Sequence, residues 1–523
     1  MTTKYDIAVV GSGFSGSLIA MVARRLGHTV VLLEKGRHPR FAIGESSTPL
    51  SNLLLESIAD RYDLPLLKPL SKWGSWQRAY PEIACGLKRG FSFFHHELYA
   101  APHSFDTDRH LLVAASPNDV VADTHWYRAD FDELLVQQAQ SVGVDYFDEV
   151  DIRTARNDSG VWRLDTVHAT REQIFEAEFL IDATGPRGFL HKLLGMGELS
   201  LPDFPATSAL YSHFSDVDEW AASPSYGVEG SPYPVDAAAV HHVFDGGWIW
   251  VLRFNNGLTS AGVAATHEVA EQLLFEQKEY AWKRLLDALP LVGDQFRRAR
   301  AERPLTLARQ LSFRSSSIAG SNWALLPSAA GFVDPLLSSG FPLALLGIRR
   351  LGTILEQDWN SARMPLSLQE YARQTDDELL ATARLVGALY RNMGDFPLFR
   401  CLSLLYFAAA SYSEVARRLN KPGLASTFLL HDHPVFGTES RRILKVAQGP
   451  MDHSEKARLT DDVYGLIRDF DVAGLGKRPA NHCYPVVAED LFASAHKLGA
   501  DAKEIEALLQ RTGFYAAAHH GPH

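Results

Sequence analysis

The chain has 523 residues, of which 46% are hydrophobic and 22% are charged, as in ordinary globular proteins. Its 51 basic and 62 acidic side chains give a formal net charge of −11, which argues against a nucleic-acid-binding surface and against attraction to an acidic membrane. Cys85, Cys401 and Cys483 are far apart and form no CxxC pair, so neither a disulfide framework nor a metal site of the zinc type is predicted. A cytoplasmic location is expected, because the sequence shows no leader and no apolar run of the roughly 18 residues that a spanning helix needs.

The first 35 residues predict a parallel strand–helix–strand unit. Residues 7–10 are a β-branched strand, residues 18–26 are a helix that Gly27 closes, and residues 29–33 are a second apolar strand. A glycine-rich turn, Gly-Ser-Gly-Phe-Ser-Gly, joins the first strand to the helix at residues 11–16. This order of elements is typical of a Rossmann-like nucleotide-binding fold.

The turn itself carries a dinucleotide-binding motif. Gly11, Gly13 and Gly16 allow a tight turn, a close approach of the backbone to a pyrophosphate, and close packing of helix on strand. The helix N-terminus favours the anionic phosphates. Glu34, 23 positions after Gly11, can accept hydrogen bonds from a ribose diol. Because the motif follows a strand, opens a helix and has its acidic residue in place, we predict dinucleotide binding here.

Three further motifs favour FAD over a nicotinamide cofactor. They are Gly-Glu-Ser-Ser-Thr-Pro at residues 44–49, Arg128 followed by Phe131 and Asp132, and Asp-Ala-Thr-Gly-Pro at residues 182–186. In these motifs and their order the chain resembles the flavin-dependent halogenases, within the wider class of FAD monooxygenase folds. The resemblance implies that the first loop lies near the flavin, that Arg128 contacts the cofactor and that the third motif lines its adenosine side.

The resemblance also implies a set of residues that bind FAD. These residues lie in the glycine-rich turn, just after the second strand, in the three motifs just named, and between residues 328 and 340. They are Gly11, Gly13, Phe14, Ser15, Gly16, Glu34, Lys35, Glu45, Ser46, Ser47, Arg128, Asp182, Ala183, Thr184, Gly185, Ser328, Pro335 and Gly340.

A second strong motif, Phe-Val-Asp-Pro-Leu-Leu-Ser-Ser-Gly, occupies residues 332–340. It is similar to the halogenase signature Phe-x-x-Pro-x-x-Ser-x-Gly, which lies between the flavin and the substrate tunnel. Ser339 and Gly340 directly precede an apolar helical stretch, so their backbone N–H groups would point from a helix N-terminus toward a halide. The family pattern implies that Trp248, Trp250 and Phe332 line the tunnel.

A lysine is the candidate catalytic residue. Taken alone, Lys88 beside Arg89 is typical of a solvated surface pair. However, it stands in a Lys-x-Gly-x-x-Phe setting similar to that of the family's catalytic lysine, which would hydrogen-bond hypohalous acid or form a haloamine. We therefore predict that Lys88 is catalytic, with Lys72 as the alternative.

The chain departs from the family pattern at three points. Residues 248–253 read Trp-Ile-Trp-Val-Leu-Arg where the family has Trp-x-Trp-x-Ile-Pro, so Arg253 either binds an anionic substrate group or faces solvent. Ser328 replaces an aspartate and would bond a ribityl hydroxyl less strongly. Leu337 stands where tryptophan-specific members have a glutamate, so free tryptophan is not expected as the substrate.

The rest of the chain predicts an α/β (α+β) architecture. Residues 60–130 are predicted to be irregular, whereas strands are expected at residues 162–167 and 176–181 and an antiparallel sheet over residues 205–265. We expect a Rossmann-like FAD-binding domain over residues 1–355, with a substrate-binding sheet interleaved at about residues 60–125 and 200–315.

The remaining part, residues 356–523, is predicted to be mostly helical. Its apolar run at residues 402–410 is typical of a buried helix, with a lid over a substrate channel as the alternative. The last residues, 519–523, are expected to form an unstructured end.

The favoured hypothesis is a two-component halogenase of the phenol or pyrrole type, acting in natural-product or antibiotic biosynthesis. The resemblance implies that FADH2 and O2 form a C4a-hydroperoxide, that chloride or bromide attacks its distal oxygen, and that Lys88 positions the resulting hypohalous acid. The substrate would be a sizeable electron-rich aromatic, free or tethered to a carrier protein. With one complete dinucleotide motif in the chain, a separate flavin reductase is implied as partner.

Two alternatives stay open. The altered tryptophan motif supports an FAD monooxygenase that hydroxylates an aromatic substrate. The Pro-Ser pair at residues 327–328, where the family has Gly-Asp, is compatible with a flavin-binding protein that has lost turnover.

Overall fold

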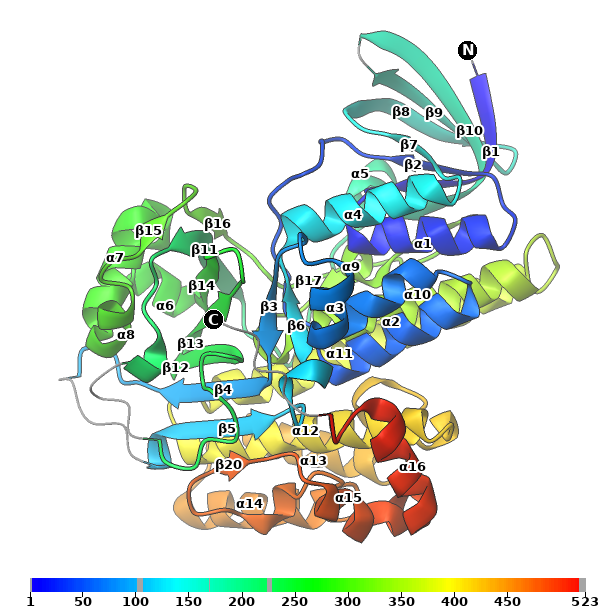
Figure 1. Cartoon of the computed structure of the whole chain (residues 1–523). Helices are drawn as coiled ribbons and strands as arrows, with labels where there is room; N and C mark the ends of the chain where they lie inside the picture. Colours follow the sequence, from blue (N-terminus) through cyan, green and yellow to red (C-terminus); the bar gives the residue numbers. More distant parts are fainter. Residues whose placement is uncertain (1, 101–106, 169, 223–227, 517–523) are drawn as a thin grey trace.

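Two large sheets and a helical C-terminal region make up the molecule (Figure 1). The computed structural model describes residues 2–100, 107–168, 170–222 and 228–516, so the expected unstructured end at residues 519–523 lies outside the described residues. A single apolar core runs from the first sheet to the C-terminal helices, and a second core lies on the far face of the second sheet. The predicted α/β class with a helical C-terminal region is confirmed.

The first sheet holds the nucleotide-binding unit. Five of its strands run parallel, and in order across the sheet they are β7 (Asp145–Phe147), β2 (Val30–Leu33), β1 (Thr2–Val10), β10 (Arg171–Asp182) and β18 (Trp323–Leu325). Two strands continue the sheet antiparallel from the first half of β10, and they are β9 (Val161–His168) and β8 (Val150–Asp158). The isoleucine, valine and leucine side chains of β1 and β2 are buried, as parallel strands covered on both faces require.

A layer of helices packs beside this sheet. Helix α1 (Phe14–Arg25) contacts α4 (Arg128–Ser141) and α10 (Gly340–Gln357), and α10 also contacts α2 (Pro49–Arg61) (Figure 1). Every residue of α1 from Phe14 to Ala23 is buried, because the small side chains Gly16, Ser17 and Ala20 let the neighbours approach closely. This packing fixes the start of α1, and hence the glycine-rich turn, against the strands.

The second sheet has eight strands in one path and a ninth beside it. Its order is β15 (Arg300–Ala301), β11 (Thr207–Ser215), β14 (Thr259–Thr266), β13 (Gly247–Arg253), β12 (Ala239–Phe244), β4 (Gly90–His95), β5 (His110–Ala114) and β20 (Cys483–Tyr484), while β16 (Thr306–Ala308) pairs with β11. The predicted antiparallel pairing of residues 205–265 is confirmed for β11 to β14. Both faces are buried: Trp248 and Trp250 join the main core, and Ile249 and Val251 join the second core.

Residues 60–130 are not irregular, and that prediction is wrong. They contain α3 (Trp73–Ala79), the strands β4 and β5, and a separate two-stranded ribbon formed by β3 (Cys85–Lys88) and β6 (Asp123–Trp126). The strands are short, and β4 pairs with β12, about 150 residues further along, so the local pattern gives little sign of them. The ribbon lies between the two sheets, near the centre of the molecule (Figure 1).

Shorter elements connect the sheets. The helices are α5 (Phe189–Leu193), α6 (His267–Gln272), α7 (Glu279–Ala288), α8 (Pro290–Gln295) and α9 (Pro327–Ala330), and a further pair of strands is β17 (Phe313–Arg314) and β19 (Gly331–Phe332).

The C-terminal region is helical, as predicted. Its helices are α11 (Met364–Arg391), α12 (Phe396–Arg418), α13 (Phe436–Ala447), α14 (His453–Ile467), α15 (Ala488–Ser494) and α16 (Ala502–Thr512). Helix α12 contains the apolar run at residues 402–410 and is buried, because Phe399 and Phe407 pack edge-on against Phe93 and Phe91 of β4. Among the described residues, no helix is both long enough and apolar enough to cross a bilayer.

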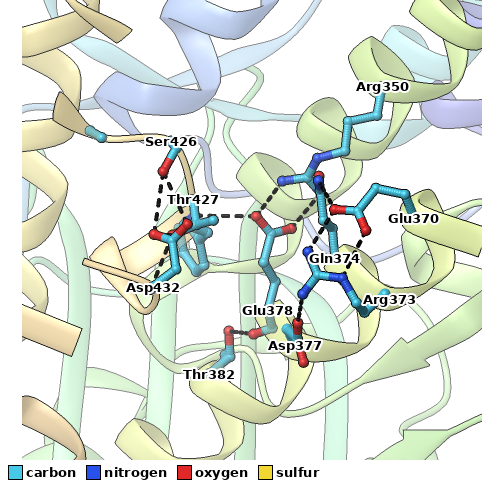
Figure 2. A network of polar contacts seen from close by, with 12 residues as sticks. Arg350, Glu370, Arg373, Gln374, Asp377, Glu378, Thr382, Ser426, Thr427 and Asp432 are labelled. Carbon is cyan, nitrogen blue, oxygen red and sulfur yellow. Dashed lines mark hydrogen bonds and ion pairs between the residues drawn. The ribbon is translucent and has the colours of Figure 1, made fainter. Parts of the chain in front are cut away.

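A buried ion pair joins α10, α11 and the loop before α13 (Figure 2). Glu378, which is 1% exposed, accepts hydrogen bonds from both terminal nitrogens of Arg350 and, at 3.2 Å, from the backbone N–H of Phe428. Beside it, Arg373 pairs with Glu370 and Asp377 on the exposed side of α11. Only the first of these pairs is withdrawn from water.

We expect Glu378→Ala to lower the free energy of unfolding by about 3–5 kcal/mol, because it leaves the Arg350 charge buried without its partner. The matched control Glu370→Ala removes an exposed pair and should cost less than ~1 kcal/mol. Urea denaturation followed by tryptophan fluorescence measures both, and equal midpoints for the two variants would contradict this assignment.

Candidate active site

The carboxyl ends of β1, β2 and β10 bring the sequence-predicted cofactor residues to one edge of the sheet. Gly11 follows β1 with φ of +97°, and a Cβ there would lie 2.7 Å from the carbonyl oxygen of Ala183, which follows β10. The backbone N–H of Ala183 donates to the carbonyl of Val10 at 2.8 Å. Gly16 is equally constrained, because a Cβ at this position would overlap the carbonyl oxygen of Gly11.

Glu34, at the end of β2, is held as an ionised acceptor. Its Oε2 accepts from the N–H and hydroxyl of Ser12, both at 2.9 Å, and its Oε1 accepts from the N–H of Gly36 at 2.9 Å. Burial alone would raise the pKa of Glu34, but these N–H groups and the Arg40 guanidinium outweigh it, so the pKa is lowered. A carboxylate in this state is suited to accept the two hydroxyls of a ribose.

Two guanidinium groups face the glycine-rich turn. Arg128 is clamped by Asp132 at 2.8 and 2.7 Å, and its Nη1 donates to the carbonyls of Ile43 and Gly44. A Cβ built on Gly13 would lie 3.5 Å from Nη2 of Arg128 and 3.7 Å from Nη2 of Arg40. The buried Nε of Arg40 and Oγ of Ser15 have no hydrogen-bond partner among the described residues. Unpaired donors beside a helix N-terminus fit a pyrophosphate.

Asp182 shapes the third motif. Its Oδ1 accepts from the N–H and hydroxyl of Thr184 at 2.8 and 2.6 Å, and its Oδ2 accepts from the N–H of Leu190 at 2.6 Å. Both carboxylate oxygens are therefore engaged within the protein. Burial raises the pKa of Asp182, and the bonds from Thr184 and Leu190 oppose that effect.

The other predicted cofactor residues lie around these anchors. Phe14 and Ser15 begin α1, Gly185 of the third motif has φ of +82°, and Ser328 lies in α9, which follows β18 beside Asp182. Lys35 is exposed, whereas Glu45 is buried and contacts Nε2 of His213 at 2.7 Å. Ser46 and Ser47 lie beside the ribbon.

The signature loop at residues 332–340 is strained and ends at a helix. Leu337 and Ser338 have φ values of 65° and 55°, a left-handed conformation that costs a non-glycine residue on the order of 1–2 kcal/mol. Ser339 is the N-cap of α10 and Gly340 is its first residue, as predicted from the sequence. Gly340 is exposed, and a Cβ there would meet nothing within 4 Å, so open space lies before this helix N-terminus.

Asp334 holds this loop to the second sheet. Its Oδ1 accepts from the N–H of Leu336 at 2.9 Å and from Nε1 of Trp248 at 3.2 Å, and its Oδ2 accepts from the hydroxyl of Tyr390 at 2.9 Å. Trp248, predicted to line the tunnel, is thus bonded to the signature loop, whereas Trp250 donates to Ser260. The half-buried Phe332 of β19 pairs with Phe313 of β17. Neither Asp334 nor Tyr390 was found from the sequence.

Lys88 is wholly buried, so the interpretation of it as a surface residue is wrong. Its Nζ donates to the hydroxyl of Ser46 at 2.8 Å, the carbonyl of Ser47 at 2.6 Å and the hydroxyl of Ser338 at 3.4 Å, and it lies 3.9 Å from the ring centre of Phe91. Burial lowers the pKa of Lys88, and the nearby Asp123 carboxylate opposes that effect.

The neighbouring basic residues have other partners. Arg89 points away from Lys88 to Asp119 and to the carbonyl of Ser116. Lys72, the alternative catalytic residue, forms an ion pair with Glu56 at 3.2 Å. The Ser338 contact therefore distinguishes Lys88, since it joins that lysine to the signature loop.

A cavity of about 180 Å³ lies between the ribbon, β4, β5 and the C-terminal helices. Its lining includes Lys72 and two neighbours of Lys88, Phe91 and Asp123, but not Lys88 itself. Its walls are mostly apolar and aromatic, and the residues near the ribbon and α12 that matter here are Asn52, Phe91, Asp123, Tyr406, Phe407 and Glu414. Helix α12 forms one wall, so the buried run at residues 402–410 also bounds the cavity, in line with both hypotheses for it.

Arg253 follows neither of the two predictions made for it. It is half-buried, its Nε lies 3.3 Å from Asp236, and its other nitrogens donate to the backbone carbonyls of Val217 and Asp218. These partners lie in the segment between β11 and β12, so the departure from the family's Ile-Pro is absorbed by local contacts.

A comparison with known protein families shows to which family this chain belongs. A family model described as tryptophan halogenase matches residues 116–403, more than half of the chain. The chain belongs to the tryptophan halogenase family. A model described as an NAD(P)-binding Rossmann-like domain matches residues 9–50, the region of the glycine-rich turn and Glu34. The flavin-dependent halogenase resemblance seen in the motifs is confirmed, and with it that the protein is an enzyme.

Individual members of the family agree with this assignment. The chain is 28% identical to the monodechloroaminopyrrolnitrin halogenase PrnC of Pseudomonas fluorescens, over 77% of this chain and 71% of that protein. It is 28% identical to the tetracycline 7-halogenase of Kitasatospora aureofaciens, over 80% of this chain and 75% of that protein. The fold is similar to that of halogenase PltM in complex with phloroglucinol and FAD, with a TM-score of 0.80 and 24% identity over 92% and 99% of the chains.

The charge on Asp334 predicts a pH dependence of stability. Burial raises its pKa from 3.8 to about 7, against the bonds from Leu336, Tyr390 and Trp248. Between these two values the folded carboxyl is protonated while the unfolded one is ionised, so its stabilising contribution is complete below the unfolded pKa and is lost as pH rises through 7. Asp334→Asn stays neutral throughout. The difference in Tm, variant minus wild type, should therefore grow from pH 5 to pH 8 in thermal scans. A Tm difference that does not change with pH would refute this prediction.

Proposed function

We propose that this enzyme uses FADH2 and O2 to transfer chloride or bromide to an electron-rich aromatic ring. The observation that carries the proposal is the position of Lys88, which is buried, bonded to Ser338 of the signature loop and in contact with Phe91, a residue that lines an aromatic cavity. A lysine placed between an anion-binding loop and an apolar cavity is suited to pass an electrophile from one to the other.

FAD is the cofactor that the site fits. The turn at residues 11–16 with Arg128 and Arg40 would hold the pyrophosphate, Glu34 the ribose, and the open space before Gly340 the flavin ring. When bound in reduced form, FAD supplies the activation of O2 that oxidises a halide. The chain carries one such turn, so we propose that a separate flavin reductase provides FADH2.

The N-terminus of α10 is the proposed halide site. The backbone N–H groups of Ser339 and Gly340 belong to the first turn of a helix of 18 residues, where the helix dipole favours an anion. The left-handed conformation at Leu337 and Ser338 sets the direction of these groups, and the bonds of Asp334 to Leu336 and Trp248 maintain it.

Lys88 would orient hypohalous acid by hydrogen bonding. Its three donors already have oxygen partners, and the bond to Ser338, at 3.4 Å, is the longest and the easiest to replace. Its buried position keeps bulk water away, which strengthens the donation and protects the acid from hydrolytic loss.

The proposed substrate is a phenol or pyrrole with one ring, smaller than the sizeable aromatic expected from the sequence. A cavity of about 180 Å³ is comparable with one of ~150 Å³ that holds benzene in another protein. The neighbour PltM is described in complex with phloroglucinol, a compound with one ring. A relative from Pseudomonas fluorescens acts on a pyrrole held by a carrier protein, so tethered delivery is a second route to the same cavity.

We expect Gly13→Val to abolish FAD binding while leaving the fold intact. Gly13 has φ of −65°, and its Cβ would make ordinary contacts with Arg128, so the folded protein tolerates a side chain that fills the phosphate path. Flavin absorbance after gel filtration and a thermal scan measure the two properties. Gly423→Val, at a position where a Cβ meets nothing within 4 Å, is the control. Stoichiometric flavin in the Gly13 variant would place the cofactor elsewhere.

We expect Lys88→Ala to lose brominated product but to keep O2-dependent reoxidation of FADH2, because the reoxidation does not involve the lysine. The assay supplies FADH2, O2, bromide and resorcinol and reads products by mass. Lys72→Ala should still brominate, since the Lys72 ammonium pairs with Glu56.

The same assay separates halogenation from hydroxylation. Wild-type product must show the bromine isotope doublet and must depend on bromide. A gain of one oxygen atom in buffer free of halide, without brominated product at any bromide concentration, would instead establish a monooxygenase. Loss of activity in Lys72→Ala alone would move the catalytic role to Lys72.

A further inference from the structure

Asp123 presents a buried carboxylate oxygen without a partner at the cavity. It is 3% exposed, its Oδ1 accepts from Nδ2 of Asn52 at 2.6 Å, and its Oδ2 has no hydrogen-bond partner among the described residues. Buried carboxylate oxygens are nearly always hydrogen-bonded, so an unpaired one beside a cavity indicates a missing ligand.

The ribbon places Asp123 next to the catalytic candidate. Asp123 on β6 is the direct cross-strand partner of Lys88 on β3, so the two side chains leave the same face of the ribbon. The three hydrogen bonds of the Lys88 ammonium go to Ser46, Ser47 and Ser338, which leaves Oδ2 of Asp123 without a bond to it.

The cavity around Asp123 has the size and character for an aromatic ring. Phe91 and Phe407 pack edge-to-face with ring centres 5.4 Å apart, and Tyr406 continues the wall along α12. The charged side chains of α12 that face Asp123 are Glu414 and Arg418, which bond each other at 2.7 Å. A ring placed there would meet aromatic walls and two acceptors without a partner among the described residues, the carboxylate Oδ2 of Asp123 and the neutral amide Oδ1 of Asn52.

We propose that Asp123 is the acceptor that positions the substrate: its Oδ2 binds the hydroxyl or ring N–H of a phenol or pyrrole and turns the neighbouring carbon toward Lys88. The inference rests on the proposed halogenase function and adds a residue to it. Leu337, which is buried and apolar, offers no such acceptor from the signature loop.

The chemistry balances for a phenol and the hypohalous acid that the proposed function supplies. As Asp123 takes the hydroxyl proton, the ring electron pair forms the carbon–halogen bond and the oxygen–halogen bond breaks. The hydroxide takes a proton from the Lys88 ammonium and leaves as water. Loss of the ring proton to the Lys88 amine restores the aromatic ring, and Asp123 returns its proton to the oxygen. The ring carbon is oxidised by two electrons and the halogen is reduced by two.

A binding experiment without turnover tests the acceptor role. The probes are resorcinol and 1,3-dimethoxybenzene, titrated by calorimetry into the enzyme with oxidised FAD. Wild type should bind resorcinol with an affinity about tenfold or more above that for 1,3-dimethoxybenzene, because only resorcinol can donate a charge-assisted hydrogen bond to Asp123. Asp123→Asn should reduce this preference several-fold, and Asp123→Ala, which also enlarges the cavity, should remove it.

The control is Asp119→Asn, four residues earlier, where the carboxylate is bonded to Arg89 and lies outside the cavity. It should keep the wild-type preference. A thermal scan and flavin content show that each variant is folded. If Asp123→Ala keeps the preference for resorcinol, the acceptor role is wrong.

A product experiment distinguishes this inference from the function on which it rests. With phenol and bromide, wild type should brominate mainly one ring position, and Asp123→Ala should give a mixture close to that of free hypobromous acid. A structural defect would lower yield without changing the ratio of isomers, and such an outcome overturns the proposal. If wild type gives no brominated product, the halogenase function fails, whereas the calorimetric preference still reports on Asp123.

Discussion

The arrangement of the site depends on one buried ammonium group. Lys88 is completely withdrawn from water, and an unpaired charge there would be far too costly to maintain. Its three hydrogen bonds end on two different loops, at Ser46 and Ser47 on one side and Ser338 on the other. The lysine can stay buried only while both loops keep their positions, so the two loops and the ribbon must be placed together.

A second network holds the loop that Lys88 reaches. Leu337 and Ser338 adopt a left-handed conformation that neither residue prefers, and this cost must be balanced by contacts around them. Asp334 provides such contacts, because it bonds the loop backbone, Trp248 of β13 and Tyr390 of α11. The loop is therefore anchored to the second sheet and to the C-terminal helices, and the halide site proposed at its end takes its geometry from both.

The sequence predicted the parts of the site that depend on local geometry. The glycine-rich turn, Glu34 and the start of α10 at Gly340 follow from short-range rules, since each involves a turn, a strand end or a helix start. Burial and long-range partners were not accessible in this way. Lys88 was typical of a surface pair because its partner Ser338 is 250 positions away, and Tyr390 lies 142 positions from Trp248.

Asp123 and Arg253 both show that sequence motifs do not reveal the partners of a side chain. Asp123 belongs to no motif, and only the pairing of β3 with β6 reveals that it faces Lys88. Arg253 stood out in a motif, yet Asp236 and two backbone carbonyls satisfy it locally. Asp334 lies inside the signature loop, but at a position that the family signature leaves variable. Neither that signature nor the tryptophan motif alone indicates its hydrogen bond with Trp248.

The cofactor site and the cavity are built in different ways. The cofactor residues gather at the carboxyl edge of the first sheet, where the chain must adopt specific backbone shapes and tolerates little change. The cavity is bounded instead by side chains of α12 and β4 packed on the ribbon, and side chains can be exchanged without moving the backbone. Because α12 also carries the Glu414–Arg418 pair that faces Asp123, a substitution on this helix changes both the shape of the cavity and the field at its acceptor. Substrate preference can therefore diverge through α12 while the glycine-rich turn and the Lys88 contacts stay constant.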